Sequence, residues 1–422
     1  MLKLAAAVVD VTPPDGQVIG MVLPERPAPA LDPLYARLFL LDDGKRRFLA
    51  VSLDYCGTTG AEHRKWVSEL AMAAGTTVEM TMLHSVHQHD APFINVPVST
   101  RLYPGCDFSW LDDVLGKLKA AAAALEGRLA PVARLGWSET RMHGYASNRR
   151  VPMPDGRIAT RYSRCGEPEI RNRPVGDIDP ILRTLGFYGQ DGALMASWSF
   201  YATHPQVGNL GLMYGGDAPG EAMRILRERL PGAVHSPFNG CFGNITAGKY
   251  SDPYDTEGNI RKFGRKVADT IIRNLASQEL FDAPDSLEWD RAVFPFPERE
   301  YKENHEYDSM PIVREAMLRA HDWALENAPE MYPVSLLGLG DVRIFWLPGE
   351  LFVEYQIWLQ AQAPDEKLCV VGNCGDDFYY VGTAEAVSDP EGYEMRSFCR
   401  TAPEFEGLFK KTAGEMLRAK GL

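Results

Sequence analysis

The chain has 422 residues, with 44 Lys and Arg against 57 Asp and Glu, which gives a formal net charge of −13 at pH 7. Its apolar content of 45% is that of an ordinary globular protein. A nucleic-acid or anionic-membrane surface is not expected, because such surfaces need clustered cations. The seven cysteines are scattered and form no CxxC pair. This spacing argues against a zinc–thiolate site or a disulfide framework and favours a reducing compartment.

The N-terminus is apolar but short. Asp10 interrupts it, and Thr12-Pro13-Pro14 follows. We interpret this segment as a first strand rather than a signal peptide. No run of about 18 apolar residues occurs, so no membrane span is expected. Together these features predict a cytoplasmic protein.

Strands and helices are predicted to alternate loosely along the chain. Apolar β-rich stretches predict strands at 47–53, 77–83, 182–187, 194–202 and 342–347. Helical periodicity predicts helices at 61–73, 110–126, 218–230, 259–276, 312–327 and 352–363. This order indicates an α/β or mixed α+β fold. No shift in composition marks a boundary, so one domain is expected over 1–422.

Two stretches, 141–177 and 281–305, look irregular. The first carries many Arg, Pro and Gly, and the second mixes Pro with acidic and aromatic residues. Long irregular segments of compact proteins often form walls or lids of an active site. We expect that role here, with a simple surface excursion as the alternative.

Three of the nine histidines, His84, His87 and His89, follow directly after an apolar stretch. Imidazole is a common metal ligand and titrates near neutral pH. Successive side chains of a strand point to opposite faces, so His87 and His89 are expected to share a face. His84 would point away and is interpreted as structural. The pair is expected to bind a metal ion or to catalyse a reaction, unless one or both are buried structural histidines.

Two later segments repeat this pattern of an apolar strand that ends in a polar side chain. His204-Pro205 follows the stretch 194–202, and Glu350 follows 342–347. With His87 they form a two-His, one-carboxylate set with an open position, which catalytic zinc prefers. The alternatives are an iron oxygenase site with the same ligands, or a Glu350 that only complements a helix dipole.

Several familiar sites are absent from the sequence. The small-residue loop 240–248 lacks the Lys-Ser/Thr ending of a phosphate-binding loop. Neither a GxSxG nor an HExxH motif occurs. Tyr380 and Tyr393 could bind a metal or polarise a carbonyl, although core packing is the favoured explanation for isolated tyrosines.

In chain order, these segments resemble the catalytic domain of the neutral/alkaline (non-lysosomal) ceramidase family. Val86-His87-Gln88-His89-Asp90-Ala91-Pro92 is similar to the family's Thr-His-Thr-His-Ser-Gly-Pro. The other matching segments are 9–14, 35–44 with 51–54, 148–150, and 201–205 with 216–220. The resemblance implies two packed mixed β-sheets flanked by helices.

The resemblance also implies a zinc site. The ion would be held by His87, His204, Glu350 and a tyrosine, for which Tyr380 matches better than Tyr379. His89 would be the catalytic histidine, and Arg149 and Tyr393 would line the substrate carbonyl.

The chain departs from the family in three places. Thr246 stands in the position of the family's serine, so a catalytic role is carried over to Thr246 by resemblance only. Asp376-Asp377-Phe378 replaces an Asn-x-Tyr pattern, and the chain stops at 422 without the family's immunoglobulin-like domain.

The leading hypothesis is therefore a zinc-dependent hydrolase of an amide, or of an ester or lactone. A metal-activated water and His89 as acid and base would carry the reaction. The substrate would be a small-molecule or lipid-like amide, without a nucleic-acid partner. The alternative is a ceramidase-like protein that binds a metal or ligand without catalysis.

Overall fold

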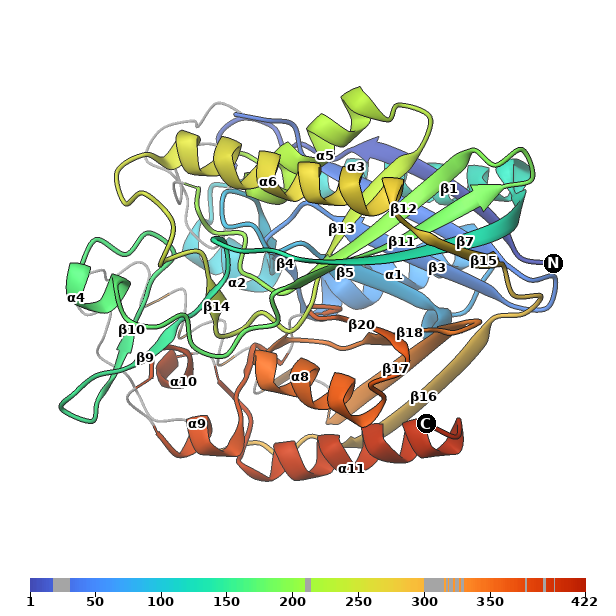
Figure 1. Cartoon of the computed structure of the whole chain (residues 1–422). Coiled ribbons are helices and arrows are strands. Elements are labelled where there is room, and N and C mark those ends of the chain that lie inside the picture. Colours follow the sequence, from blue (N-terminus) through green and yellow to red (C-terminus); the bar gives the residue numbers. More distant parts are fainter. Residues whose placement is uncertain are drawn as a thin grey trace.

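Two β-sheets packed face to face form the centre of the computed structural model (Figure 1). The structure describes residues 1–17, 31–208, 214–299, 315, 318, 322, 326–327, 330–375, 378–389, 392–397 and 399–422. The larger sheet has nine strands in the order β13-β12-β11-β7-β1-β2-β3-β5, with β15 paired to β7. Its strands are β1 (Lys3–Asp10), β2 (Tyr35–Asp42), β3 (Arg47–Leu53), β5 (Thr81–Ser85), β7 (Ala130–Arg141), β11 (Ile181–Gly189), β12 (Leu194–Tyr201), β13 (Val234–Asn239) and β15 (Glu279–Asp282).

The smaller sheet has four strands, in the order β16-β17-β18-β20. They are β16 (Glu288–Pro295), β17 (Met331–Leu339), β18 (Val342–Trp346) and β20 (Lys367–Val371). Both sheets are mixed, because β3–β5, β12–β13 and β18–β20 pair in parallel while the other neighbours are antiparallel.

Large aromatic side chains fill the space between the two sheets. Trp198 of β12 and Trp346 of β18 meet edge to face, with ring centroids 6.1 Å apart. Phe238 of β13 contacts both tryptophan rings. Perpendicular aromatic pairs of this kind stabilise a core beyond the burial of their area.

Helices cover the outer face of each sheet (Figure 1). α1 (Gly60–Ala74) and α3 (Trp110–Leu125) pack on β1, β2 and β3, and α5 (Asp217–Arg229) and α6 (Thr256–Ala276) lie against the other half of the larger sheet. α8 (Val353–Gln362) and α11 (Glu404–Ala419) cover the smaller sheet. The expectation of two packed mixed sheets flanked by helices is confirmed.

The larger sheet curls so that its edge strand β13 contacts β1, β2 and β3, and the end of β13 reaches the end of β5. The N–H of Asn239 donates to Nε2 of His84 over 3.3 Å, and the Asn239 side-chain amide donates to the carbonyl of Val86. The Ser52 hydroxyl of β3 donates to the carbonyl of Pro237 over 2.9 Å. This curl brings the loops after β5 and β12 close together, although many strands separate β5 from β12 within the sheet.

Most sequence-predicted elements are present within one or two residues of their expected ends. The segment 77–83 is an exception, because 78–80 form a short 3-10 helix (Val78–Met80) and β5 starts only at Thr81. The sequence pattern did not predict β7, β13, β16, β17, β20 or α11. The helix expected at 312–327 lies largely outside the described residues.

The two stretches expected to be irregular differ from each other. Residues 141–177 do form short strands and turns, including β8 (Ser147–Asn148), β9 (Arg150–Pro152) and β10 (Ile158–Thr160). Within 281–305, the interpretation as a loop is wrong for β16, an edge strand of the smaller sheet paired with β17 along its whole length. In the described part of the chain, no helix is long and apolar enough to cross a membrane.

Candidate metal centre

His87 lies in a tight turn just after β5. Its φ of 69° is left-handed, a conformation that costs free energy for a residue with a Cβ. The His87 backbone N–H donates to the carbonyl of Tyr55 over 3.0 Å, and ring Nδ1 lies 2.7 Å from the carbonyl of Cys56. Because Nδ1 has this backbone partner, Nε2 is the ring nitrogen left for a metal ion.

His204 follows β12 and meets His87 where the sheet curls. Its Nδ1 lies 2.9 Å from the carbonyl of Phe242, which again leaves Nε2 available. One carboxylate oxygen of Glu350 lies 3.0 Å from Nε2 of His204 and 3.4 Å from Nε2 of His87. These three side chains are all buried, and each offers a ligand atom within 4.8 Å of the other two.

Glu350 lies in a short strand, β19 (Glu350–Leu351), and α8 begins only at Val353. The alternative that Glu350 merely complements the helix dipole is therefore wrong, since Glu354 is the acidic residue in the first turn. β19 pairs in parallel with β21 (Tyr380–Val381), and Glu350 stands directly opposite Tyr380. Residues paired in this way point to the same face.

This pairing places Tyr380, rather than Tyr379, beside the cluster. The Tyr380 hydroxyl lies 3.5 Å from Nε2 of His204. Tyr379 instead uses its backbone carbonyl, which accepts a hydrogen bond of 2.8 Å from the N–H of Glu350. Tyr379 also has a positive φ of 49°.

Burial keeps the His204 imidazole neutral. Desolvation lowers the pKa of His204 to about 3, helped by the nearby Arg149 guanidinium and opposed by Glu350. Burial alone would raise the pKa of Glu350, but His87, His204 and Arg149 together hold it below its usual value. Neutral imidazoles and an ionised carboxylate are the forms that bind a metal ion. The donor set of two imidazoles, one carboxylate and a neighbouring phenol therefore fits Zn²⁺.

His89 stands next to His87, with ring centroids 4.9 Å apart and the rings perpendicular. The side-chain amide of Gln206 contacts Nδ1 of His89 at 3.1 Å. Nε2 is buried, and no hydrogen-bond partner for it exists among the described residues. Burial and the neighbouring His87 and His204 hold the pKa of His89 well below its usual value. His89 is thus a neutral imidazole with one nitrogen available.

Arg149 connects the remaining predicted residues. It is buried, and its guanidinium donates to the Tyr380 hydroxyl over 3.0 Å. The Arg149 guanidinium also lies 2.8 Å from Nδ1 of His204 and 5.3 Å from the ring centre of Tyr393. Burial would lower the pKa of Arg149, but Tyr380, Glu394 and Tyr393 raise it overall. A fixed positive charge therefore stands at the edge of the candidate metal centre.

Two sequence-predicted residues have structural surroundings. The Thr246 hydroxyl donates to the carbonyl of Arg161 and accepts from the N–H of Gly248, both over 3.1 Å. Both hydrogen bonds hold the loop rather than the cluster, so a catalytic role of Thr246 stays a prediction. His84 is fully buried against Phe238 and accepts from the N–H of Asn239, as expected for a structural histidine.

Sequence reasoning missed two side chains that support the predicted ones. Glu394, only 1% exposed, lies 3.3 Å from Nη1 of Arg150 and 3.7 Å from Nε of Arg149. Gln206, which contacts His89, stands two residues after His204. Gln206 could have been suspected from the sequence, because it is a polar residue close to the predicted ligand His204. Nothing in the sequence marks Glu394 as a partner of Arg149.

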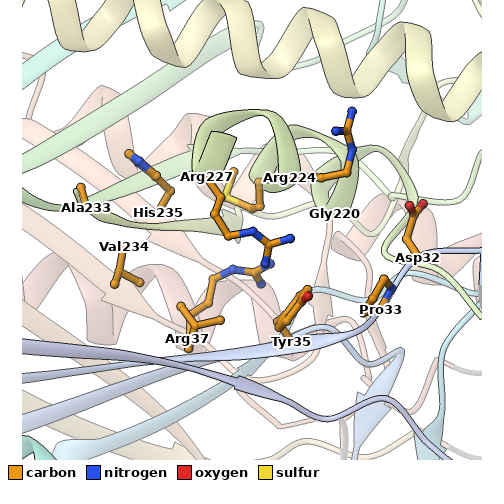
Figure 2. Close-up of a pocket in the computed structure, with 12 residues that line it drawn as sticks. Asp32, Pro33, Tyr35, Arg37, Gly220, Arg224, Arg227, Ala233, Val234 and His235 are labelled. Carbon is orange, nitrogen blue, oxygen red and sulfur yellow. The ribbon is translucent and has the colours of Figure 1, made fainter. Parts of the chain in front are cut away.

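A separate cavity of about 70 Å³ lies between the larger sheet and α5. Figure 2 shows the side chains of Arg37, from β2, and Arg227, from α5, extending toward each other in this cavity. Arg37 is bound by Asp54 at 2.7 Å, and the Arg227 guanidinium lies over the ring of Tyr35. None of the sequence-predicted site residues lines this cavity, so it is distinct from the metal centre.

Comparison with known proteins gives a clear result for the fold. No family model matches the sequence, and no curated protein matches it. Among solved structures, the neutral ceramidase from Pseudomonas aeruginosa matches with a TM-score of 0.74 at 17% identity. A ceramidase complexed with C2 matches with a TM-score of 0.75 at 16% identity. Each match covers 99% of this chain and 75% of the other chain. The chain therefore shares the ceramidase fold that its motifs led us to expect.

Proposed function

We propose that the chain is a metal-dependent hydrolase of an amide bond. The observation that carries this proposal is the convergence of three buried ligand side chains from three separate segments, His87, His204 and Glu350. Burying two imidazoles and a carboxylate together is unfavourable without a partner that all three can share. Zn²⁺ suits this donor set, with the Tyr380 hydroxyl as a fourth ligand.

When bound, zinc supplies a polarised substrate carbonyl and a water acidic enough to be deprotonated near neutral pH. His89 would take up a proton on its available Nε2 and deliver it to the leaving amine. Burial favours the neutral form of His89, which is the form that can accept a proton. Gln206 orients the ring from the opposite nitrogen.

Arg149 and Tyr393 stabilise the negative charge that develops on the carbonyl oxygen. The Arg149 guanidinium is held by Tyr380 on one side and Glu394 on the other, so it does not have to reorganise during the reaction. Tyr393 stacks over the same guanidinium. The substrate class is an N-acyl amide, which the ceramidase neighbours support, with esters and lactones as chemically related candidates.

Metal analysis of the purified full-length protein tests this proposal. We expect one equivalent of zinc in the wild type and loss of stoichiometric zinc in His87→Ala and in Glu350→Ala. His143→Ala is the matched control, because His143 is exposed and belongs to neither group of candidate metal ligands. A wild type without metal, together with unchanged metal affinity in both variants, would refute the proposal.

A ceramidase-like protein that binds metal without catalysis is the second candidate. The hydrogen bonds that occupy the Thr246 hydroxyl favour it, because the family's serine position then holds a structural side chain. A panel of N-acyl amides separates the two candidates. Zinc content without turnover of any amide would favour the binding protein, whereas turnover that is lost in His89→Gln would favour the hydrolase.

A further inference from the structure

A cysteine thiol, that of Cys56, lies close to His87 and His89. The Sγ of Cys56 and one ring nitrogen each of His87 and His89 lie within 4.8 Å of one another. We propose that these three side chains form a second ligand set, for a soft metal ion, which shares His87 with the first. Binding at the second set does not depend on the proposed hydrolase function.

The backbone holds this second set in place. Cys56 is only 5% exposed, and its N–H donates to the carbonyl of Pro92 over 2.9 Å. The next residues form β4 (Gly57–Thr58), which pairs in parallel with β6 (Phe93–Ile94). The segment that carries the thiol is therefore tied to the segment that follows His89. A ligand set on paired segments is preorganised and does not have to be assembled by the ion.

The ring nitrogens available in this set can be assigned. Nδ1 of His87 is used by the Cys56 carbonyl, so Nε2 is the donor toward both sets. Nδ1 of His89 contacts Gln206, and its buried Nε2 is left for an ion. One imidazole nitrogen binds one ion at a time. The two ligand sets therefore exclude each other.

The two sets differ in the metal that they prefer. The first combines two imidazoles with a carboxylate, whereas the second combines two imidazoles with a thiolate, a softer ligand that shifts the preference toward softer ions such as Cu⁺. On binding, the Cys56 S–H loses its proton to the buffer as the sulfur–metal bond forms. An ion held here also withdraws His89 from acid–base chemistry, so we expect it to inhibit; that consequence alone rests on the proposed function.

Cadmium provides a direct readout, because a cadmium–thiolate bond has a charge-transfer absorption in the ultraviolet. Full-length protein, with and without prior treatment with a chelator, is titrated with Cd²⁺. We expect the absorption to saturate at one equivalent in the wild type, to disappear in Cys56→Ser and to persist in Cys106→Ser, the matched cysteine control. Glu350→Gln should retain the absorption, since it alters only the first set. In untreated protein, cadmium binding should release the resident metal ion.

Two further measurements keep the result unambiguous. His89→Gln leaves the thiol in place and should lower the cadmium affinity, even if Cys56→Ser were to fold poorly. Cys56→Ser should keep its full zinc content, so the first set is tested separately from the second. No absorption in the wild type, its survival in Cys56→Ser, or its loss in Glu350→Gln would each overturn the inference.

Discussion

At the scale of single residues, histidines supply most of the candidate ligands and the candidate acid and base of the metal centre. In His87, His89 and His204, Nδ1 contacts a neighbouring carbonyl or amide, so Nε2 is the ring nitrogen that remains for a metal ion or a proton. A hydrogen bond to the ring nitrogen that faces away from the metal fixes the tautomer and the orientation of the ligand before the ion binds. His84 shows the contrast, because its Nε2 faces the backbone of β13 instead.

The fully buried His84 should make stability depend on pH. Burial lowers its pKa to about 3 in the folded protein, against 6.5 for an exposed histidine. As pH falls below about 6.5, the unfolded chain binds the proton first, so the free energy of unfolding falls continuously toward pH 3. We expect His84→Gln to reduce this slope in chemical denaturation of the metal-free protein. His143→Gln, at an exposed position, should leave the slope unchanged; equal slopes in all three proteins would contradict the assignment.

Glu394 should act as a positioning residue for Arg149. Its carboxylate is buried between Arg149 and Arg150, and removing the charge leaves the Arg149 guanidinium without its carboxylate partner. For Glu394→Gln we expect kcat to fall about 10- to 100-fold with zinc content unchanged. Asp389→Asn, which alters the more exposed partner of Arg150, is the control and should have a much smaller effect. Loss of zinc in Glu394→Gln would instead indicate a structural role.

At the scale of elements, the two-residue pairing of β19 with β21 builds half of the metal centre. It sets Glu350 opposite Tyr380 and gives Tyr379 a backbone role. We expect Tyr380→Phe to weaken zinc binding by at least about tenfold, measured by competition with a chelator. Tyr379→Phe is the matched control and should bind zinc like the wild type. The reverse order of the two affinities would assign the ligand to Tyr379.

The sequence allowed the strand ends at His87, His204 and Glu350 to be recognised, because each polar residue directly follows an apolar stretch. It did not reveal β19, since two residues carry no periodicity, and Glu350 therefore resembled the start of α8. The strands β7 and β13 were missed for a related reason. β7 carries Arg, Gly and Ser among its apolar residues, and β13 contains a proline. Their pairing is decided by distant partners rather than by local preference.

At the scale of the whole molecule, the packing of the two sheets against each other stabilises the fold. Trp198 is fully buried where β12 faces the smaller sheet. We expect Trp198→Ala to lower the free energy of unfolding by about 3–5 kcal/mol, through lost burial and the cavity left behind. Met72→Ala, at a side chain that is 74% exposed, should change it by no more than about 0.5 kcal/mol. Urea denaturation of the three proteins measures both values, and a small effect at Trp198 would show that the sheets are joined elsewhere.

The overall architecture was predictable mainly through the ordered set of motifs. Composition and periodicity alone reached only a mixed α/β domain. The curl that joins β5 to β13 depends on contacts such as that between Asn239 and His84, far apart in the sequence. Because such long-range contacts leave no local sequence pattern, the proximity of His87 to His204 could be expected only from the family resemblance.

The left-handed backbone at His87 has a consequence for protein engineering. Asn373 and Tyr379, which flank the same centre, also have positive φ values, of 55° and 49°. Glycine would relieve about 1–2 kcal/mol at such positions. A selection for heat resistance alone would therefore favour glycine at these positions and, at His87, discard the ligand itself. Thermal robustness and metal binding compete for the same few residues, so a useful stabilised variant has to draw its gains from elsewhere in the chain.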